Sequence, residues 1–360
     1  MSEHSDEIRS AVSNMLAQKV IDTGTAKETW DRKTWGALTE SGFTELGVPE
    51  HLGGSGGDLS DVVDVVATLA NHGASTPIIE HALAGWLVSS AAVQVPKGVG
   101  TVAVGSAAEL TVIEVDGSIW VDGRLTAVPW ASEASWLAVA VDSSECTVVI
   151  IDLSDDGVRV AEGTDMVGAP LCDVVLKNVP SQQFSLNTLL GIDTHRLEMR
   201  GALLYAAATA AAASAVSTLT VDYVSGRSQF GRPLAKFQAV QQRVSSLASR
   251  TVEMERAVRV ATAACATDDE SAFAAVASAK TVVSGHVREV AAAGHQLHGA
   301  IGFTSEYRLG RFTGSMHSWR SRWGSEADWS RALASMILDR GCGVWELVTG
   351  QADRTEGVVV

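Results

Sequence analysis

The chain has 360 residues, with 42 acidic against 27 basic side chains and a formal net charge of −15. This balance argues against nucleic acid or an anionic membrane as the main partner, because both bind basic patches. Hydrophobic residues make up 46% and charged residues 19% of the chain, which excludes a largely disordered protein. The first ten residues are polar and acidic and resemble no export signal, so a cytoplasmic protein is expected.

Helical periodicity dominates the N-terminal part of the chain. Apolar residues recur at intervals of three and four within 35–46 and 62–69, which predicts amphipathic helices. Glycines and a proline between these stretches predict a loop at 47–58. Asp58 or Ser60 could cap the helix that follows, because either side chain can accept a hydrogen bond from a free backbone N–H group at a helix start.

Strand signals replace the helical pattern from about residue 98 to residue 185. Short runs rich in valine, isoleucine and threonine occur at 101–104, 110–115, 136–141 and 146–153. Asp-Gly pairs, which favour tight turns, lie at 116–117, 122–123 and 156–157. This pattern is typical of antiparallel strands joined by hairpins.

Long helical patterns return after residue 189. They cover about 192–225, 234–266, 269–299 and 325–349. The alanine-rich run 202–216 is shorter than the roughly 20 strongly apolar residues of a membrane span, so it predicts a buried helix and no membrane insertion. Helices of this length with short connections pack as an antiparallel bundle.

The order of these zones predicts an α+β protein that is mostly α. We expect an N-terminal helical domain at 1–97, a central β-domain at 98–188 and a C-terminal four-helix bundle at 189–360. Helix-only and doubly wound folds do not match this order.

A motif with possible chemistry connects the first two long C-terminal helices. Residues 227–233 read Arg-Ser-Gln-Phe-Gly-Arg-Pro, and Phe237 and Gln238 follow. An arginine beside a tight turn is well placed to hold a diphosphate, because guanidinium pairs bidentately with phosphate oxygens. The alternative is an ordinary helix–turn–helix corner with a surface arginine.

A second motif ends the helix predicted at 269–299. Its glycines could let a ligand approach the backbone closely, and Gln296 could hydrogen-bond to a nucleotide. The alternative is a glycine C-cap. His295 and His298 lack a third ligand nearby, so no metal site is predicted. The tryptophan-rich stretch 319–329 predicts core or subunit packing.

Several familiar motifs are missing from the sequence. No GxGxxG opens a βαβ unit, and no P-loop or GxSxG elbow occurs. The four cysteines lack CxxC spacing. The sequence therefore does not support nicotinamide or ATP binding through these motifs. It also does not support a hydrolase serine or a zinc site.

Taken together, these segments resemble the acyl-CoA dehydrogenase family over most of the chain. The matching residues are Leu46 to Glu50 with Gly53 and Gly54, Arg227 to Pro233 with Phe237 and Gln238, and Gln296 to Tyr307. The resemblance implies the three-domain fold described above, with FAD held between subunits.

The resemblance also implies which residues contact the cofactor. The residues matching Arg227, Phe230 and Gln238 contact FAD in the family, and those matching Gln296 and Gly299 reach the cofactor of a neighbouring subunit. Ala300 stands where the family usually has a second glycine. Such enzymes desaturate an acyl-CoA thioester between Cα and Cβ: a carboxylate removes the α-proton, the flavin takes a hydride, and an electron-transfer flavoprotein-like acceptor takes the electrons.

The expected catalytic carboxylate is missing. The family's common base position, a glutamate followed by glycine, falls on Trp323 and Gly324. The second position used by some relatives falls on Gly201, and Glu198 lies one helical turn earlier. Glu198 is either a displaced base or an ordinary solvated glutamate. The segment 128–132 is only a loose counterpart of the family's flavin-embracing loop.

These departures resemble the partner subunits of heteromeric acyl-CoA dehydrogenases in actinobacterial steroid degradation. The hypothesis is a subunit of an α2β2 complex that acts on a bulky, steroid-like acyl-CoA and completes the FAD site of a catalytic partner. One alternative is a self-sufficient homotetramer that uses a displaced base such as Glu198. Another is a non-catalytic scaffold subunit.

Overall fold

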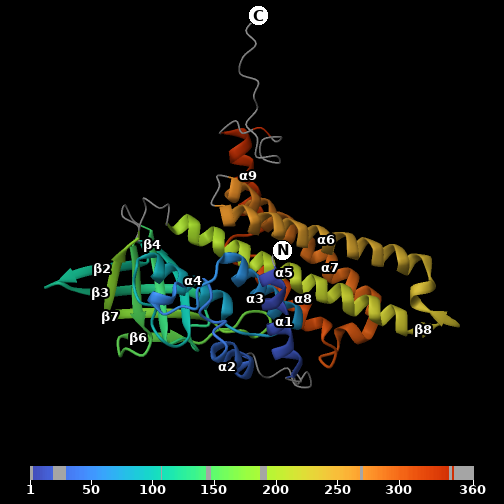
Figure 1. The fold of residues 1–360 in the computed structure, drawn as a ribbon, viewed down its shortest axis with the longest axis horizontal. Helices are drawn as coiled ribbons and strands as arrows, with labels where there is room; N and C mark the ends of the chain where they lie inside the picture. Colours follow the sequence, from blue (N-terminus) through green and yellow to red (C-terminus); the bar gives the residue numbers. More distant parts are fainter. Residues whose placement is uncertain are drawn as a thin grey trace, which may run out of the picture.

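The computed structural model describes residues 3–18, 30–106, 108–142, 147–186, 193–267, 271–339 and residue 343. The described chain has a helical N-terminal part, a central sheet and a long helical bundle (Figure 1). The predicted α+β, mostly α fold is confirmed.

The N-terminal part is helical, as its periodicity predicts. Its helices are α1 (Glu3–Gln18), α2 (Arg32–Glu40), the 3-10 turn η1 (Glu50–Leu52), α3 (Leu59–His72) and α4 (Ile78–Ser90). Asp58 is the N-cap of α3: its carboxylate accepts from the backbone N–H groups of Ser60 at 2.7 Å and Asp61 at 3.2 Å. Asp61 accepts in return from the Asp58 N–H at 3.0 Å, which completes a capping box.

The central sheet contains the four predicted strand runs. Its strands are β1 (Gly100–Ser106), β2 (Leu110–Val115), β3 (Ser118–Pro129), β4 (Trp136–Asp142), β5 (Thr147–Asp152), β6 (Val158–Ala161) and β7 (Leu171–Ser185). The strand order is β1-β4-β5-β7-β3-β2, with β6 paired to β7. Cys146, which began one predicted run, lies outside the described residues.

Two details of the predicted sheet are wrong. β1 pairs with β4 in parallel, whereas hairpins alone would make every pair antiparallel. The pair Asp122-Gly123 lies inside β3 at a register shift rather than in a turn. Gly123 has φ +145°, and a Cβ there would lie 2.1 Å from the carbonyl oxygen of Glu109, so the glycine serves a bulge with close backbone contact.

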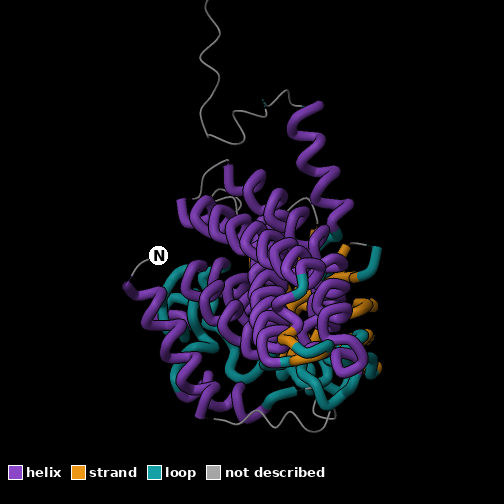
Figure 2. The backbone as a smooth tube through the Cα atoms, turned by 90° about the vertical axis from the view of Figure 1, so that its right-hand side faces the viewer, coloured by secondary structure: helices purple, strands orange, loops and turns teal. Residues whose placement is uncertain are grey.

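The C-terminal bundle is built around α5 (Thr194–Gly226). Its other elements are the short strands β8 (Ser228–Gln229) and β9 (Arg232–Pro233), the 3-10 turns η3 (Leu234–Lys236) and η4 (Gly299–Phe303), and the helices α6 (Gln238–Thr267), α7 (Ser271–His298), α8 (Leu309–Trp319) and α9 (Glu326–Leu338). In Figure 2 the long helices, in purple, run side by side, and α5, α6 and α7 all contact one another. The fourth predicted helix extended to residue 349, and its end lies outside the described residues.

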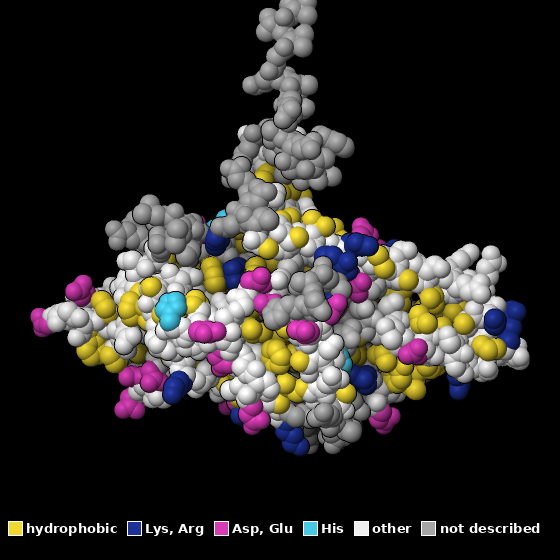
Figure 3. All heavy atoms as spheres, viewed as in Figure 1, with side chains coloured by type: hydrophobic (Ala, Val, Ile, Leu, Met, Phe, Trp, Pro, Cys, Tyr) yellow, Lys and Arg dark blue, Asp and Glu magenta, His cyan; other side chains and the backbone are white. Residues whose placement is uncertain are grey.

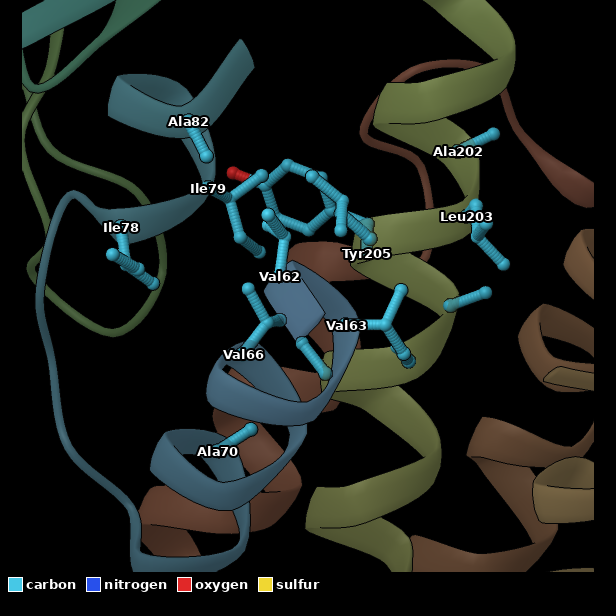
Figure 4. Packing of buried hydrophobic residues seen from close by; sticks show 14 of the residues in the cluster. Val62, Val63, Val66, Ala70, Ile78, Ile79, Ala82, Ala202, Leu203 and Tyr205 are labelled. Carbon is cyan, nitrogen blue, oxygen red and sulfur yellow. The ribbon is translucent and has the colours of Figure 1, made fainter. Parts of the chain in front are cut away.

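Helix α5 joins the parts of the molecule. It packs against α3 on one side and against α6, α7 and α8 on the others. By length and composition it could cross a membrane, but 72% of its most apolar window is buried inside the protein, as expected for a core helix. Figure 4 shows where Val62 and Val66 of α3 and Ile79 of α4 meet Tyr205 of α5.

Candidate functional site

A cavity of about 520 Å3 lies where the sheet meets one end of the bundle. Strands β1 and β3 form one wall, and the N-terminal ends of α5, α7 and α9 form the other. The lining includes Val104 and Leu125 from the sheet, Phe273 from α7 and Trp329 from α9. It is mostly apolar, with a few polar groups, as small-molecule sites usually are.

The indole ring of Trp323, which lines this cavity, packs against the backbone of Gly201. A Cβ built on Gly201 would be 2.4 Å from both Cγ and Cδ2 of Trp323, so the indole ring covers the glycine directly. The two positions at which the family resemblance places the base are therefore in contact, and neither carries a carboxylate.

A tight turn holds Trp323 in place. Its φ is +52°, and Gly324 follows with φ +91°. The indole N–H of Trp329 donates to the backbone carbonyl of Trp323 at 2.8 Å. A left-handed non-glycine residue is costly, and here the following glycine and the hydrogen bond stabilise it. The tryptophans of this stretch pack against the protein core, as the sequence predicts.

The far end of α8 also steadies this turn. The ammonium of buried Lys280 donates to the carbonyl of Trp319 at 3.3 Å, and the hydroxyl of Ser284 donates to the carbonyl of Arg320 at 3.0 Å. Burial lowers the pKa of Lys280 to about 7. The C-terminus of a helix favours a cation, but Lys280 is almost fully enclosed, and this burial opposes its charged form.

Glu198 lines the cavity, but its side chain is half exposed. Its carboxylate lies 3.9 Å from the imidazole Nδ1 of His195 on the same helix. The geometry thus places Glu198 at the edge of the cavity, one turn before Gly201.

Glu80 is a carboxylate of this cavity that the sequence reasoning missed. It lies on α4, is only 2% exposed, and accepts a hydrogen bond from the hydroxyl of Tyr205. Burial raises the pKa of the Glu80 carboxyl, while the Tyr205 hydrogen bond and the charge of Arg322 offset part of the rise. One sequence signal could have found it: a lone carboxylate within the apolar helix Ile78–Ser90.

Arg322 also lines the cavity, and its positive charge offsets part of the rise in the pKa of the Glu80 carboxyl. Its guanidinium is 3.8 Å from the carboxylate of Asp165, which extends from the β-domain. Asp165 in turn accepts from the hydroxyl of Ser318 at 2.5 Å. Charged residues from three parts of the chain therefore meet at this junction.

The loose counterpart of the flavin-embracing loop contributes only part of its residues to the cavity. Val128 and Pro129 line it. Trp130 does not: it has φ +59°, is 6% exposed, and packs its ring against Trp30 with centroids 6.2 Å apart.

The first predicted FAD segment lies at the opposite end of the bundle. Arg227 is the C-cap of α5, and β8 and β9 protrude beyond it (Figure 1). Phe230 is 88% exposed with φ +51°, and Gln238 is exposed at the first position of α6. Arg227 is 29 residues beyond Glu198 on one continuous helix, which at 1.5 Å per residue separates the two by roughly 40 Å.

The second predicted FAD segment lies at the same end as the first. Gln296 and Gly299 line a second cavity of about 440 Å3. The ring of Tyr223, one turn before Arg227, stacks on His298 of α7 with centroids 4.6 Å apart. The fold therefore brings together two predicted segments that are about 60 residues apart in the chain.

The groups at this end suit a dinucleotide. Besides Gln296, the second cavity is lined by Arg288, His295 and His317. Gly299 has φ +64° with open space where a Cβ would be, so its backbone is accessible. Guanidinium and amide groups are the donors that diphosphate and adenine require. Basic side chains gather at this tip of the molecule (Figure 3).

Comparison with known families agrees with this architecture. Residues 2–115 match the N-terminal domain and residues 194–326 the C-terminal domain of acyl-CoA dehydrogenases. The chain belongs to the acyl-CoA dehydrogenase family. Members of this family are oxidoreductases that act on CH–CH bonds and use FAD, and the donor groups around Gln296 and Arg227 fit that cofactor.

Individual relatives come largely from mycobacteria. The chain is 31% identical over 281 residues to acyl-CoA dehydrogenase IpdE2 of Mycobacterium tuberculosis, covering 78% of this chain and 79% of that protein. The ChsE4–ChsE5 complex of M. tuberculosis matches with a TM-score of 0.81 at 18% identity, covering 94% of this chain and 98% of that one. The steroid acyl-CoA dehydrogenase Tcur3481–Tcur3483 matches with 0.82 at 19% identity, covering 95% and 99%.

Proposed function

We propose that this chain is the non-catalytic subunit of a heteromeric acyl-CoA dehydrogenase and completes the FAD site of a catalytic partner subunit. The observation that carries the proposal is that Trp323 and Gly201 occupy the two base positions, contact each other, and both lack a carboxylate. Removal of an α-proton needs a base within hydrogen-bond reach. An indole ring cannot serve, because it carries only a donor.

The position of the FAD-contacting residues supports the second part of the proposal, that they act on the FAD of a partner subunit. Arg227, Phe230 and Gln238 are exposed at the end of the bundle remote from the chain's own cavity. A cofactor held there cannot reach that cavity across roughly 40 Å of helix. These residues therefore act on the cofactor of another subunit.

The chain's own residues have defined tasks in this arrangement. Arg227 holds the diphosphate of the partner's FAD, and Phe230 and Gln238 contact the same cofactor. Gln296 hydrogen-bonds to it from the neighbouring helix end, and Gly299 lets the backbone come close. When bound, FAD supplies the hydride acceptor for desaturation of the acyl thioester.

The substrate and partners follow from the relatives. Two of the solved relatives are complexes of two different subunits, and one of these is named a steroid acyl-CoA dehydrogenase. We infer an α2β2 complex in the cytoplasm that desaturates a bulky, steroid-derived acyl-CoA and passes electrons to an electron-transfer flavoprotein-like acceptor.

Purification of the chain alone and with its homologous partner tests this function. We expect the isolated chain to carry little flavin and no dehydrogenase turnover, and the complex to have both. Full flavin absorbance together with turnover from the isolated chain would show that it is self-sufficient.

Substitution of Arg227 separates an active role from a scaffold role. In the complex, Arg227→Ala should lower flavin occupancy and turnover, because the diphosphate loses a charge-assisted, bidentate contact. The matched control is Arg259→Ala, which removes another exposed arginine from the bundle surface. Unchanged flavin content in both variants would favour the non-catalytic scaffold.

One observation keeps a second candidate in view: Glu198 lines the chain's own cavity. In a self-sufficient homotetramer Glu198 would be the base, and Glu198→Gln would lower turnover by orders of magnitude at unchanged flavin content. The control is Glu109→Gln, which alters another carboxylate lining the same cavity. The proposed function predicts that neither change affects the chemical step.

A further inference from the structure

The cavity beside Trp323 has the size and walls of a ligand site even though it lacks a base. Its volume of about 520 Å3 is within the usual range for small-molecule pockets. Trp323, Trp329 and Phe273 supply aromatic surface, and the last two rings lie 5.8 Å apart. An apolar body of several carbon atoms would be well covered there.

A buried carboxylate and a partly buried guanidinium also line this cavity. Glu80 is 2% exposed, and Tyr205 donates to its Oε1 atom. Oε2 accepts from no side chain among the described residues. Arg322 stands 3.8 Å from Asp165, beyond hydrogen-bond distance, so its guanidinium retains donors for another group. A buried carboxylate such as Glu80 gains stability from each further hydrogen bond that it accepts.

The rim of the cavity is acidic, whereas the phosphates of a CoA thioester require basic groups. Glu109, Glu198 and Asp328 are exposed carboxylates that line it. Asp328 lies 3.3 Å from Arg331, and Glu198 lies 3.9 Å from His195. Glu109 has no ion-pair partner among the described residues, so the phosphates of CoA would still meet a net negative charge at this rim, which is unfavourable at short range. An uncharged ligand escapes this repulsion.

We propose that this cavity binds an uncharged, largely hydrocarbon alcohol, whose body lies against Trp323 and whose hydroxyl is held between Glu80 and Arg322. A hydroxyl group donates one hydrogen bond and accepts others. It can therefore donate to the Glu80 carboxylate and accept from the Arg322 guanidinium at the same time. This site does not depend on the role of the chain in FAD binding.

Calorimetric titration of the full chain tests the proposal. The probes are trans-4-cyclohexylcyclohexanol, bicyclohexyl, which lacks only the hydroxyl, and octanoyl-CoA. We expect the alcohol to bind about tenfold more tightly than bicyclohexyl, the fold-change of one charge-assisted hydrogen bond, and octanoyl-CoA to bind more weakly than the alcohol. Equal affinity for the alcohol and bicyclohexyl, or tighter binding of octanoyl-CoA, would overturn the assignment.

Three variants place the binding in this cavity. Glu80→Gln keeps the shape of the side chain and should remove most of the advantage of the alcohol over bicyclohexyl. Ala332→Phe adds a ring to the cavity wall and should abolish binding of both probes. Glu109→Gln at the rim is the control and should leave both affinities unchanged. Wild-type binding by Ala332→Phe would refute the site even if Glu80→Gln failed to fold.

Discussion

The contact between Gly201 and Trp323 predicts that Gly201→Ala destabilises the protein, although the same substitution in an open helix stabilises it. Replacing glycine by alanine inside a helix normally stabilises a protein by about 0.5–1 kcal/mol. Gly201 lies well inside α5, so the same gain would apply if its surroundings were open. The new methyl group would, however, lie 2.4 Å from two carbons of the Trp323 ring, about 1 Å closer than an ordinary contact.

The magnitude follows from this overlap. Forcing an extra methyl group into a packed site costs about 1–3 kcal/mol. We therefore expect Gly201→Ala to destabilise the protein by about 1–2 kcal/mol. In a Trp323→Ala background the overlap is gone, and the same substitution should stabilise by about 0.5–1 kcal/mol. The coupling energy between the two positions is then about 2 kcal/mol.

Urea unfolding followed by circular dichroism measures the four proteins of this double-mutant cycle. The matched control is Gly226→Ala at the other end of α5, where a Cβ would meet nothing within 4 Å. It should be neutral or slightly stabilising in either background. If Gly201→Ala behaves like Gly226→Ala with Trp323 present, the indole ring does not cover Gly201, and the packing described for this site is wrong.

Two further predictions concern buried titratable groups. Burial lowers the pKa of Lys280 from 10.5 to about 7 in the folded chain. Between these two values the unfolded chain binds one more proton than the folded chain. The free energy of unfolding should therefore rise by about 1.4 kcal/mol per pH unit between pH 7 and 10. Lys280→Met should remove this slope in urea titrations, and an unchanged slope would contradict the burial of the ammonium. Burial lowers the pKa of His81 from 6.5 to about 4, and its Nδ1 accepts from the Gly100 N–H at 2.9 Å. Between these pH values only the unfolded chain binds the proton. The free energy of unfolding should therefore fall by about 3 kcal/mol as the pH drops from 6.5 to 4. His81→Gln should reduce that acid dependence, as thermal unfolding at pH 6.5 and 4.5 can show; equal losses in both proteins would refute it.

The FAD-contacting segments could be proposed from the sequence because each family motif is a short contiguous stretch of the chain. The Arg-Ser-Gln-Phe-Gly-Arg-Pro turn and the segment around Gln296 are each contiguous, and their roles follow from the resemblance. The absence of a glutamate before Gly324 is likewise visible in the sequence. Glu80 was not predicted, because only the folding of α4 against α5 places this carboxylate at the cavity.

The order of helical and strand zones and the helix start at Asp58 were determined by the sequence itself, since periodicity, capping and turn chemistry act over a few residues. The parallel pairing of β1 with β4, the inward turn of Trp130 and the contact of Trp323 with Gly201 were decided by the tertiary structure. Each of these depends on which distant surfaces pack together, and packing is set by shape and burial across the whole chain. The sequence therefore indicates that both base positions lack a carboxylate, while only the tertiary structure shows that the indole ring of Trp323 covers Gly201.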